Sequence, residues 1–364
     1  MNIDTKVKKT ILYDSHLSLG AKLIPFGGYY MPISYSKGIT EEYLCVRNSV
    51  GLFDVSHMGE IYIHGLNAKN FLQNITINDI NKIKTGQAQY SAMCYPNGGI
   101  IDDFILYRKQ NGYLMVVNAS NILKDYNWLS NNIQSDVKIE NLSDSYSLIA
   151  IQGPKSRKVL NKLFNYDIDL PFYSFETIKF NGFSILLSRT GYTGELGFEI
   201  YGDDDSIKYI WDILIADGVP PAGLAARDIL RMEMKYCLYG NDIDETTNPL
   251  EAGLSWITDL SKSDFIGKDS LLQIKNNKIN RQLITFIMDG RGIPRKGYEL
   301  YKDNEKIGLV TSGTQSPILK KGIGIGYIKV PFNKLDQEIS VKIRDKFIEA
   351  TIIKPPFIKN TSLF

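Results

Sequence analysis

The sequence has little of the chemistry on which metal sites and disulfide frameworks depend. It contains three cysteines and three histidines among 364 residues. Cys45, Cys94 and Cys237 lie far apart and are odd in number, so we expect reduced core thiols. No histidine stands at ligand spacing from another histidine or from a cysteine, which excludes a structural zinc site and predicts no bound metal. Acid–base chemistry therefore falls mainly to carboxylates, tyrosines and arginines.

An excess of charge and a long apolar run are also missing. The formal net charge is +2, so no basic field attracts nucleic acid and we expect no nucleic-acid partner. No apolar run approaches the ~20 residues that span a membrane, and the first ten residues lack the apolar core of a signal peptide. Phosphate-loop and nucleophile-elbow motifs are absent as well. These absences predict a cytoplasmic protein without a membrane partner.

Helical and strand patterns are mixed over residues 1–275. Helices are predicted at 40–49 with Thr40 as N-cap, at 121–133, after Pro154, after the acidic run 203–205, and after Gly223. Strand-like segments are predicted at 60–65, 104–109, 113–118, 148–152, 184–189 and 197–202. The two kinds do not alternate strictly, which indicates an α+β body rather than a doubly wound sheet.

The pattern changes at the polar break 275–278. Beyond it, short strand-like runs separated by turn residues predict a β-barrel or sandwich of about 85 residues. Gly322, Gly324 and Gly326 run into a strand without a following helix, so we interpret them as close strand packing and not as a phosphate site. We therefore divide the chain into residues 1–275 and a C-terminal domain at 276–364.

Two adjacent carboxylates stand in an apolar strand pattern, YPNGGIIDDFILYR at 95–108. Because side chains alternate along a strand, Asp102 and Asp103 leave it on opposite faces. An unpaired buried carboxylate is costly, so each needs donors, a cation or a raised pKa. One of them is expected to cap the turn through the backbone N–H groups of Gly98 and Gly99, and the other to face a pocket.

Three further segments carry polar side chains that are candidates for a site. A hairpin over 189–201 would bring Tyr192 near Glu199, with glycines that allow close approach to a flat ligand, or would be an exposed hairpin. The predicted helix 223–236 places Arg227 and Arg231 on one face, with Asp228 and Glu233 available as intrahelical partners. Taken alone, this pattern is also that of an ordinary surface stripe. In 50–60, His57 is interpreted as a satisfied core histidine.

Eight segments together resemble a known family in order and spacing. They are PFGGYYMPISY, VGLFDVSHMGE, GQAQYSAMCYPNGGIIDD, VVNASN, IAIQGP, RTGYTGELGFEIY, GLAARDILRMEMKYCLYGNDIDETTNPLEAGLSW and VTSGTQSPILKKGIGIGYI. The chain is similar along these segments to the aminomethyltransferases of the glycine cleavage system, the T proteins. The resemblance implies an α+β fold with two N-terminal lobes around a tetrahydrofolate cavity and a C-terminal antiparallel β-barrel lobe.

The resemblance also implies an activity and its partners. In that family a lipoylated carrier (H) protein presents an S-aminomethyl dihydrolipoyl arm. The enzyme transfers the one-carbon unit to tetrahydrofolate as co-substrate, giving 5,10-methylenetetrahydrofolate, ammonia and the dihydrolipoyl carrier. Functional association with the glycine decarboxylase and dihydrolipoyl dehydrogenase components follows from the same resemblance.

Family matching assigns the site residues. Asp103 takes the role of the catalytic carboxylate, which orients the folate nitrogens, accepts a proton and stabilises a passing iminium cation. The matched pocket residues are Met58, Tyr90, Asn118, Tyr192, Glu199, Arg227 and Tyr236. Glu199 is expected to accept the two parallel donors of a pterin edge. Some relatives end with a tyrosine-bearing tail that this chain lacks, so the resemblance assigns no ligand contact to the tail.

Two alternatives use the same fold. A folate-dependent demethylase of a small sulfonium or methylamine compound predicts loss or replacement of the Asp103 carboxylate, which is present here. A non-catalytic folate-binding accessory protein predicts the cysteine of a K-G-C-[FY]-x-G-Q-E signature, whereas RTGYTGELG stands in that region. Both features favour the aminomethyltransferase.

Overall fold

The computed structural model describes residues 7–363, and its first large unit is an antiparallel five-stranded sheet. The order is β11-β12-β13-β10-β4, with β4 at Gly51–Asp54, β10 at Ser147–Gln152, β11 at Phe175–Phe180, β12 at Phe183–Ser188 and β13 at Gly197–Gly202. Helices α5 (Ser156–Phe164) and α6 (Asp204–Ala216) cover one face of it. The Asp203 side chain caps α6 by accepting a hydrogen bond from the Ser206 N–H, as the acidic run predicts.

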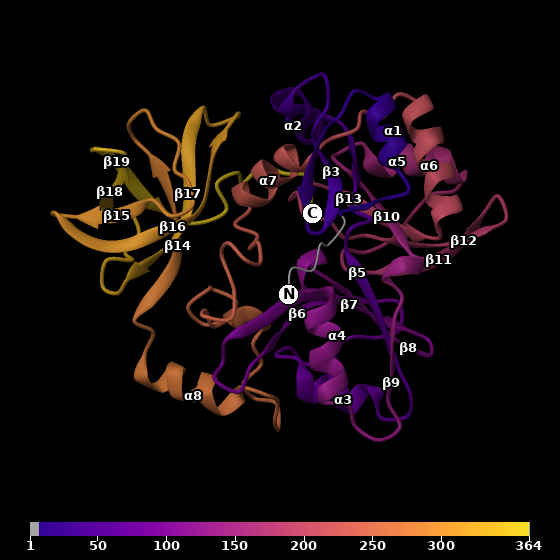
Figure 1. The fold of residues 1–364 in the computed structure, drawn as a ribbon, viewed down its shortest axis with the longest axis horizontal. Helices are drawn as coiled ribbons and strands as arrows, with labels where there is room; N and C mark the ends of the chain where they lie inside the picture. Colours follow the sequence, from indigo (N-terminus) through magenta and orange to yellow (C-terminus); the bar gives the residue numbers. More distant parts are fainter. Residues whose placement is uncertain (1–6, 364) are drawn as a thin grey trace.

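A second antiparallel five-stranded sheet has the order β6-β7-β8-β5-β9. Its strands are β5 (Gly59–His64), β6 (Ala88–Cys94), β7 (Ile100–Lys109), β8 (Gly112–Val117) and β9 (Lys138–Asn141). Helices α3 (Ala68–Ile75) and α4 (Ile122–Asn131) pack on its outer face. The two sheets and their helices therefore form two α+β layers, at the right of Figure 1.

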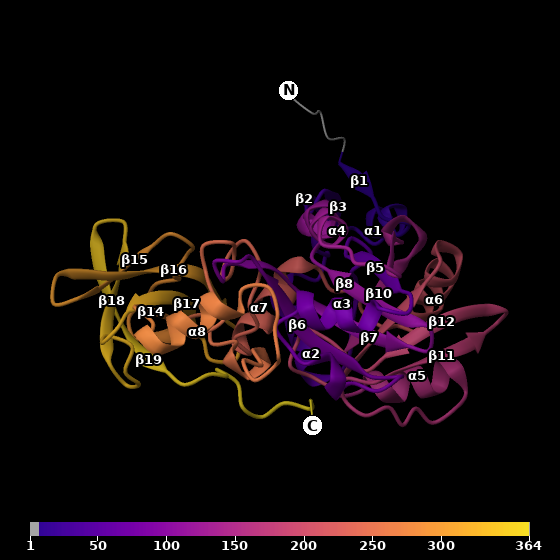
Figure 2. The same ribbon diagram turned by 90° about the horizontal axis from the view of Figure 1, so that it is seen from below.

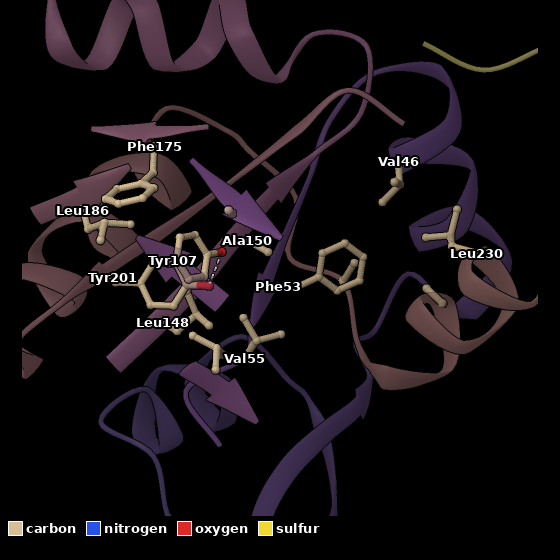
Figure 3. Packing of buried hydrophobic residues seen from close by; sticks show 14 of the residues in the cluster. Val46, Phe53, Val55, Tyr107, Leu148, Ala150, Phe175, Leu186, Tyr201 and Leu230 are labelled. Atoms are coloured by element: carbon tan, nitrogen blue, oxygen red, sulfur yellow. Dashed lines mark hydrogen bonds between the residues drawn. The ribbon is translucent and has the colours of Figure 1, made fainter. Parts of the chain in front are cut away.

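The inner faces of the two sheets share one hydrophobic core (Figure 3). Leu148 and Ala150 alternate inward on β10, as the period of two predicts. Tyr107 from β7 and Tyr201 from β13 meet with their hydroxyls 2.9 Å apart, so the hydroxyls are paired where the sheets pack. Phe175 packs edge-on against Tyr107, with ring centroids 5.3 Å apart.

The N-terminal segment adds a small sheet and two helices. Strands β1 (Lys8–Lys9), β2 (Lys22–Phe26) and β3 (Tyr29–Ser34) pair in the order β1-β3-β2, with α1 at Tyr13–Ser18 and α2 at Ile39–Asn48. The expectation that Thr40 caps α2 is wrong, because the N-cap is Gly38 at φ 85°. Positive φ favours glycine, so backbone conformation and not a side-chain cap starts this helix.

The C-terminal domain is a closed antiparallel barrel, with strands in the order β14-β17-β16-β15-β18-β19. They are β14 (Arg281–Met288), β15 (Glu299–Lys302), β16 (Glu305–Ser316), β17 (Lys321–Lys329), β18 (Glu338–Ile343) and β19 (Lys346–Ile353), preceded by helix α8 (Lys268–Asn277). A Cβ on Gly324 would lie 2.1 Å from the Phe286 ring, which confirms close strand packing there. The division of the chain at 275–276 falls inside the last turn of α8 and stays a prediction.

Helix α7 (Leu224–Glu233) lies between the barrel and the sheets (Figure 1), and it packs against β3, α2 and β16. Arg231 on α7 is 1% exposed and donates to Asp242 at 2.6 Å and to Ser312 of the barrel at 2.8 Å. This helix therefore joins the barrel to the N-terminal lobes.

A buried ionic network holds the same junction, and we call it the inter-lobe network. Arg47 of α2 donates to Glu195 at 2.8 Å and to Glu233 at 2.6 Å. Ser316 of the barrel donates to Glu233 at 2.6 Å. The prediction of an intrahelical partner for Glu233 is wrong, because its carboxylate faces Arg47 on another helix. Desolvated carboxylates require such pairing.

The tail leaves the barrel and returns to the lobes, as both views show (Figures 1 and 2). The Phe357 N–H donates to the Glu233 carbonyl at 2.8 Å, and the Ser362 hydroxyl donates to Glu195 at 2.6 Å. Within residues 7–363, no helix has the length and apolar character needed to cross a membrane.

Candidate active site

A cavity of about 1110 Å³ opens where the sheets, α7 and the tail meet. Its lining includes all of the residues predicted for the site, which come from five of the segments that carry the family resemblance: Met58, Tyr90, Asp103, Asn118, Tyr192, Glu199, Arg227 and Tyr236. The structure thus brings the predicted set together around one space, while ligand contact by each residue stays a prediction.

Asp103 is the carboxylate of β7 that faces this cavity. Tyr90 on the neighbouring strand β6 donates its hydroxyl proton to Asp103 Oδ2 at 2.7 Å. The side-chain amide of Asn118, just past β8, donates to Asp103 Oδ1 at 2.9 Å. Burial, followed by the negative charge of Asp102, raises the pKa of Asp103 to about 7. Each oxygen is oriented by one donor and keeps a further lone pair for a ligand.

Asp102 lies on the opposite face of β7 and is fully buried. It accepts hydrogen bonds from the Asn118 N–H at 3.1 Å and from the Asn121 side-chain amide at 2.6 Å. The expectation that one acid caps the turn at Gly98–Gly99 is wrong, since the Asn97 side chain accepts from the Gly99 N–H at 3.0 Å instead. Asp102 binds the amides of the segment that follows β8 and not the backbone of the turn.

Glu199 on β13 and Arg227 on α7 form the polar end of the cavity. Thr190 donates to Glu199 Oε2 at 2.5 Å, and the Tyr201 hydroxyl donates to the same oxygen at 3.3 Å. The Nη1 of Arg227 is buried and has no hydrogen-bond partner among the described residues. Burial lowers the pKa of Arg227, and the Glu199 charge opposes that shift. A buried guanidinium with a free N–H group indicates a place for a ligand acceptor.

Two stacked aromatic rings line the cavity beside Arg227. Tyr192 stacks on Tyr236 with centroids 5.7 Å apart, and the Arg227 guanidinium lies 4.8 Å from the Tyr192 ring centre. The Tyr192 hydroxyl donates to the carbonyl of Cys237, which anchors the ring. Such a surface suits a flat heterocycle.

The glycines of 189–201 have a different purpose from the one expected. A Cβ on Gly191 or Gly197 would lie 2.1 or 2.3 Å from the amide of Gln152, and one on Gly194 would lie 2.4 Å from Met234. They therefore serve mainly close packing within the protein, and Gly191 alone of them lines the cavity. The hairpin is shifted from the predicted one, because β12 pairs antiparallel with β13 with Glu199 opposite Ser188, and residues 189–196, which include Tyr192, form the connecting loop.

The sequence prediction missed several residues of the cavity wall. His57 lines it with Nδ1 unpartnered among the described residues, so the interpretation as a satisfied core histidine is wrong. Burial lowers the pKa of His57 to about 4 and keeps the ring neutral. Trp256 is 72% exposed and stacks on Tyr90 with centroids 5.9 Å apart. Leu363 of the tail also lines the cavity.

Metal chemistry finds no support in the side chains that the structure describes. Over residues 7–363, no group of three or more His, Cys, Asp or Glu residues is arranged to hold a metal ion.

Comparisons with known proteins agree with this architecture. Two family models match, the GCVT N-terminal domain over residues 12–262 and the glycine cleavage T-protein C-terminal barrel domain over residues 281–359. The chain belongs to the glycine cleavage T-protein family.

Individual relatives of this T-protein chain match along nearly their whole length. Proteins named aminomethyltransferase from Halothermothrix orenii and Flavobacterium psychrophilum are 48% and 47% identical to it, each alignment covering 97% of this chain and 100% of the relative. The crystal structure of the glycine cleavage system aminomethyltransferase T from Bartonella henselae superimposes with a TM-score of 0.93 at 31% identity, covering 98% of this chain and 99% of that one. The predicted fold, two α+β lobes and a C-terminal barrel, is thereby confirmed.

Proposed function

We propose that this T-protein family member transfers the one-carbon unit of an S-aminomethyl dihydrolipoyl carrier protein to tetrahydrofolate. Ammonia, the dihydrolipoyl carrier and 5,10-methylenetetrahydrofolate are the products, and the aminomethyltransferase name of full-length relatives supports this reaction. The observation that carries it is the cavity in which a carboxylate held by Tyr90 and Asn118 faces the same space as Glu199 and Arg227.

The residues of the cavity fit tetrahydrofolate. A volume of about 1110 Å³ is ample for a substrate of this size. Glu199 is suited to accept from the parallel N–H donors of a pterin edge, and the unpartnered Nη1 of Arg227 is suited to a pterin acceptor. The stacked Tyr192 and Tyr236 offer the flat ring a face. Met58 supplies a polarizable apolar contact beside them.

Asp103 is proposed to be the residue that handles the proton. When bound, tetrahydrofolate supplies the two nitrogens that take up the one-carbon unit. Because the pKa of Asp103 lies near neutrality, its carboxylate accepts and releases a proton at the pH of the reaction. Tyr90 and Asn118 keep the two oxygens fixed while this happens. The negative charge also stabilises positive charge that develops beside it.

The partner of the reaction is proposed to be the lipoylated carrier (H) protein. The same family membership supports functional association with the glycine decarboxylase and dihydrolipoyl dehydrogenase components. A cytoplasmic location remains our prediction from the sequence. Tetrahydrofolate is proposed as a co-substrate that is consumed and not as a resident group.

A donor comparison tests the reaction. The native chain and tetrahydrofolate are mixed with aminomethylated lipoyl carrier protein, with a methylamine compound, or with a methylsulfonium compound. We expect methylenetetrahydrofolate and ammonia from the carrier alone. Product from a small methyl donor with none from the carrier would replace this function by a demethylase, and folate binding without turnover of any donor would indicate the accessory protein.

A further inference from the structure

Asp125 of α4 is a buried carboxyl group for which the reaction described above has no use. It is 0% exposed, and neither oxygen accepts a hydrogen bond from a donor among the described residues. Its neighbour is the Asp102 carboxyl, which lies within hydrogen-bonding reach of it. We call Asp102, Asp103 and Asp125 the acid cluster.

The acid cluster is built by the chain that follows β8. Asn118 ends that strand, Asn121 closes a short 3₁₀ turn at Ala119–Asn121, and Asp125 lies one helical turn further on. Two of these side chains donate directly to Asp102 Oδ1, Asn118 at 2.8 Å and Asn121 at 2.6 Å. Asn118 also donates to Asp103, so its amide links the buried acid to the one in the cavity.

No cation forms an ion pair with the acid cluster within the described part of the chain, and the charge of Lys124 only partly opposes the rise in the pKa of Asp125. The ammonium of Lys124 is held by the Tyr239 hydroxyl at 2.8 Å and by its ring at 4.0 Å. The other titratable groups that face the cluster have pKa values raised by burial, which keeps them neutral: Tyr90, Tyr95, Tyr173, Tyr192, Tyr239 and Cys237. Adjacent carboxylates without a cation cannot all be ionised, so at least one keeps a proton.

We propose that Asp125 is a positioning residue, whose carboxylic acid hydroxyl donates to Asp102 and so holds the Asp102–Asn118–Asp103 hydrogen-bonded chain in place. The proton belongs on Asp125 because Asp102 has amide donors that favour its ionised form, whereas Asp125 has none. Burial, followed by the charge of Asp102, raises the pKa of Asp125 well above its usual range. Held as an anion, Asp102 in turn raises the pKa of Asp103.

A pair of substitutions separates donation from mere packing, and this arm rests on the catalytic role proposed for Asp103. Asp125→Asn keeps an N–H donor toward Asp102, and we expect a native rate and a native pH profile of kcat. Asp125→Leu replaces the carboxyl group by a somewhat larger apolar side chain and removes the donor, so Asp102 takes up the proton itself and no longer repels a charge on Asp103. We expect kcat to fall about tenfold with KM for tetrahydrofolate close to native, and the acidic limb of the profile to move to lower pH.

An infrared difference spectrum tests the same inference without activity. At neutral pH, the native chain minus Asp125→Asn should contain the carbonyl stretch of a protonated carboxylic acid. A difference containing carboxylate bands only would overturn the proposal, whether or not Asp125→Leu folds. A native profile for Asp125→Leu would also overturn it, as would an equal shift for both variants. If the infrared band is present but the native chain has no transferase activity, the protonation of Asp125 stands and only the role proposed for Asp103 is rejected.

Discussion

The inter-lobe network and the acid cluster both bury carboxylates, but they neutralise them differently. In the inter-lobe network, one guanidinium serves Glu195 and Glu233, and hydroxyl donors complete their shells. In the acid cluster, no ion pair forms among the described residues, and amides and protons replace the cation. The first arrangement pairs both carboxylates with a buried cation. The second keeps a carboxyl group able to titrate near neutrality.

The two ways of burying carboxylates suit different places in the molecule. A paired charge at a junction of lobes contributes to one defined arrangement of them. Buried carboxyl groups without a cation lower the free energy of unfolding. This loss is tolerated where a side chain has to exchange a proton. Asp103 lines the cavity, whereas Glu195 and Glu233 are not among its lining residues and bind Arg47 instead.

Loss of the guanidinium should cause the largest change in stability. Arg47→Met leaves two carboxylates buried without a cation, and we expect the free energy of unfolding to fall by about 3–5 kcal/mol. Chemical denaturation measures it. The matched control is Lys208→Met, which breaks the exposed Lys208–Asp212 pair and should cost about 0.5 kcal/mol or less. Equal losses for the two variants would mean that the buried network has no special role.

Loss of the charge at the polar end of the cavity should weaken folate binding. Glu199→Gln keeps the shape but replaces a charged acceptor, and we expect about 1.5–3 kcal/mol of lost affinity, or roughly a 10–100-fold higher Kd for tetrahydrofolate. Isothermal titration calorimetry measures the change. Glu305→Gln in the exposed part of the barrel is the control. An unchanged Kd for Glu199→Gln would remove Glu199 from the binding site.

A further expected effect is a dependence of stability on pH. Because the folded-state pKa of Asp125 is raised above its unfolded value, the folded chain keeps a proton that the unfolded chain loses above about pH 4. The protonated Asp125 carboxyl therefore stabilises the folded chain at low pH, and this stabilisation is lost as pH rises. Asp125→Asn should remove this loss, so its stability relative to native should grow by about 1.4 kcal/mol per pH unit between roughly pH 5 and 8. Denaturation series at several pH values measure it.

The control for this series is Asp345→Asn, on an exposed turn between β18 and β19. It should retain the native dependence on pH. Parallel curves for native and Asp125→Asn would show that Asp125 is ionised in the folded chain.

The sequence predicts those parts of the fold that local chemistry determines. Helix α6 follows from its acidic N-cap, and the opposite faces of Asp102 and Asp103 follow from strand alternation. The roles of the cavity residues came from family resemblance and not from periodicity. Helix α8 was not predicted, because it starts after Gly267 at φ 93° without a side-chain cap.

Other parts depend on contacts that a local pattern does not contain. Trp256 reaches the cavity only because its segment packs beside Tyr90. Leu363 reaches it because the tail returns from the barrel. Asp125 reads as an ordinary helix residue until α4 is placed against β7. That its oxygens lack a donor follows only from the folded structure.

The most direct test of the account is single-turnover formation of methylenetetrahydrofolate by Asp103→Asn, with tetrahydrofolate binding measured on the same protein. We expect the rate with aminomethylated carrier protein to fall by about 100-fold or more, since a positioned acid–base group contributes about that much. The Kd for tetrahydrofolate should stay close to native, and Asp345→Asn should change neither quantity. A native rate for Asp103→Asn, or a rate loss matched by an equal loss of folate affinity, would contradict the assignment of Asp103 as the chemical residue.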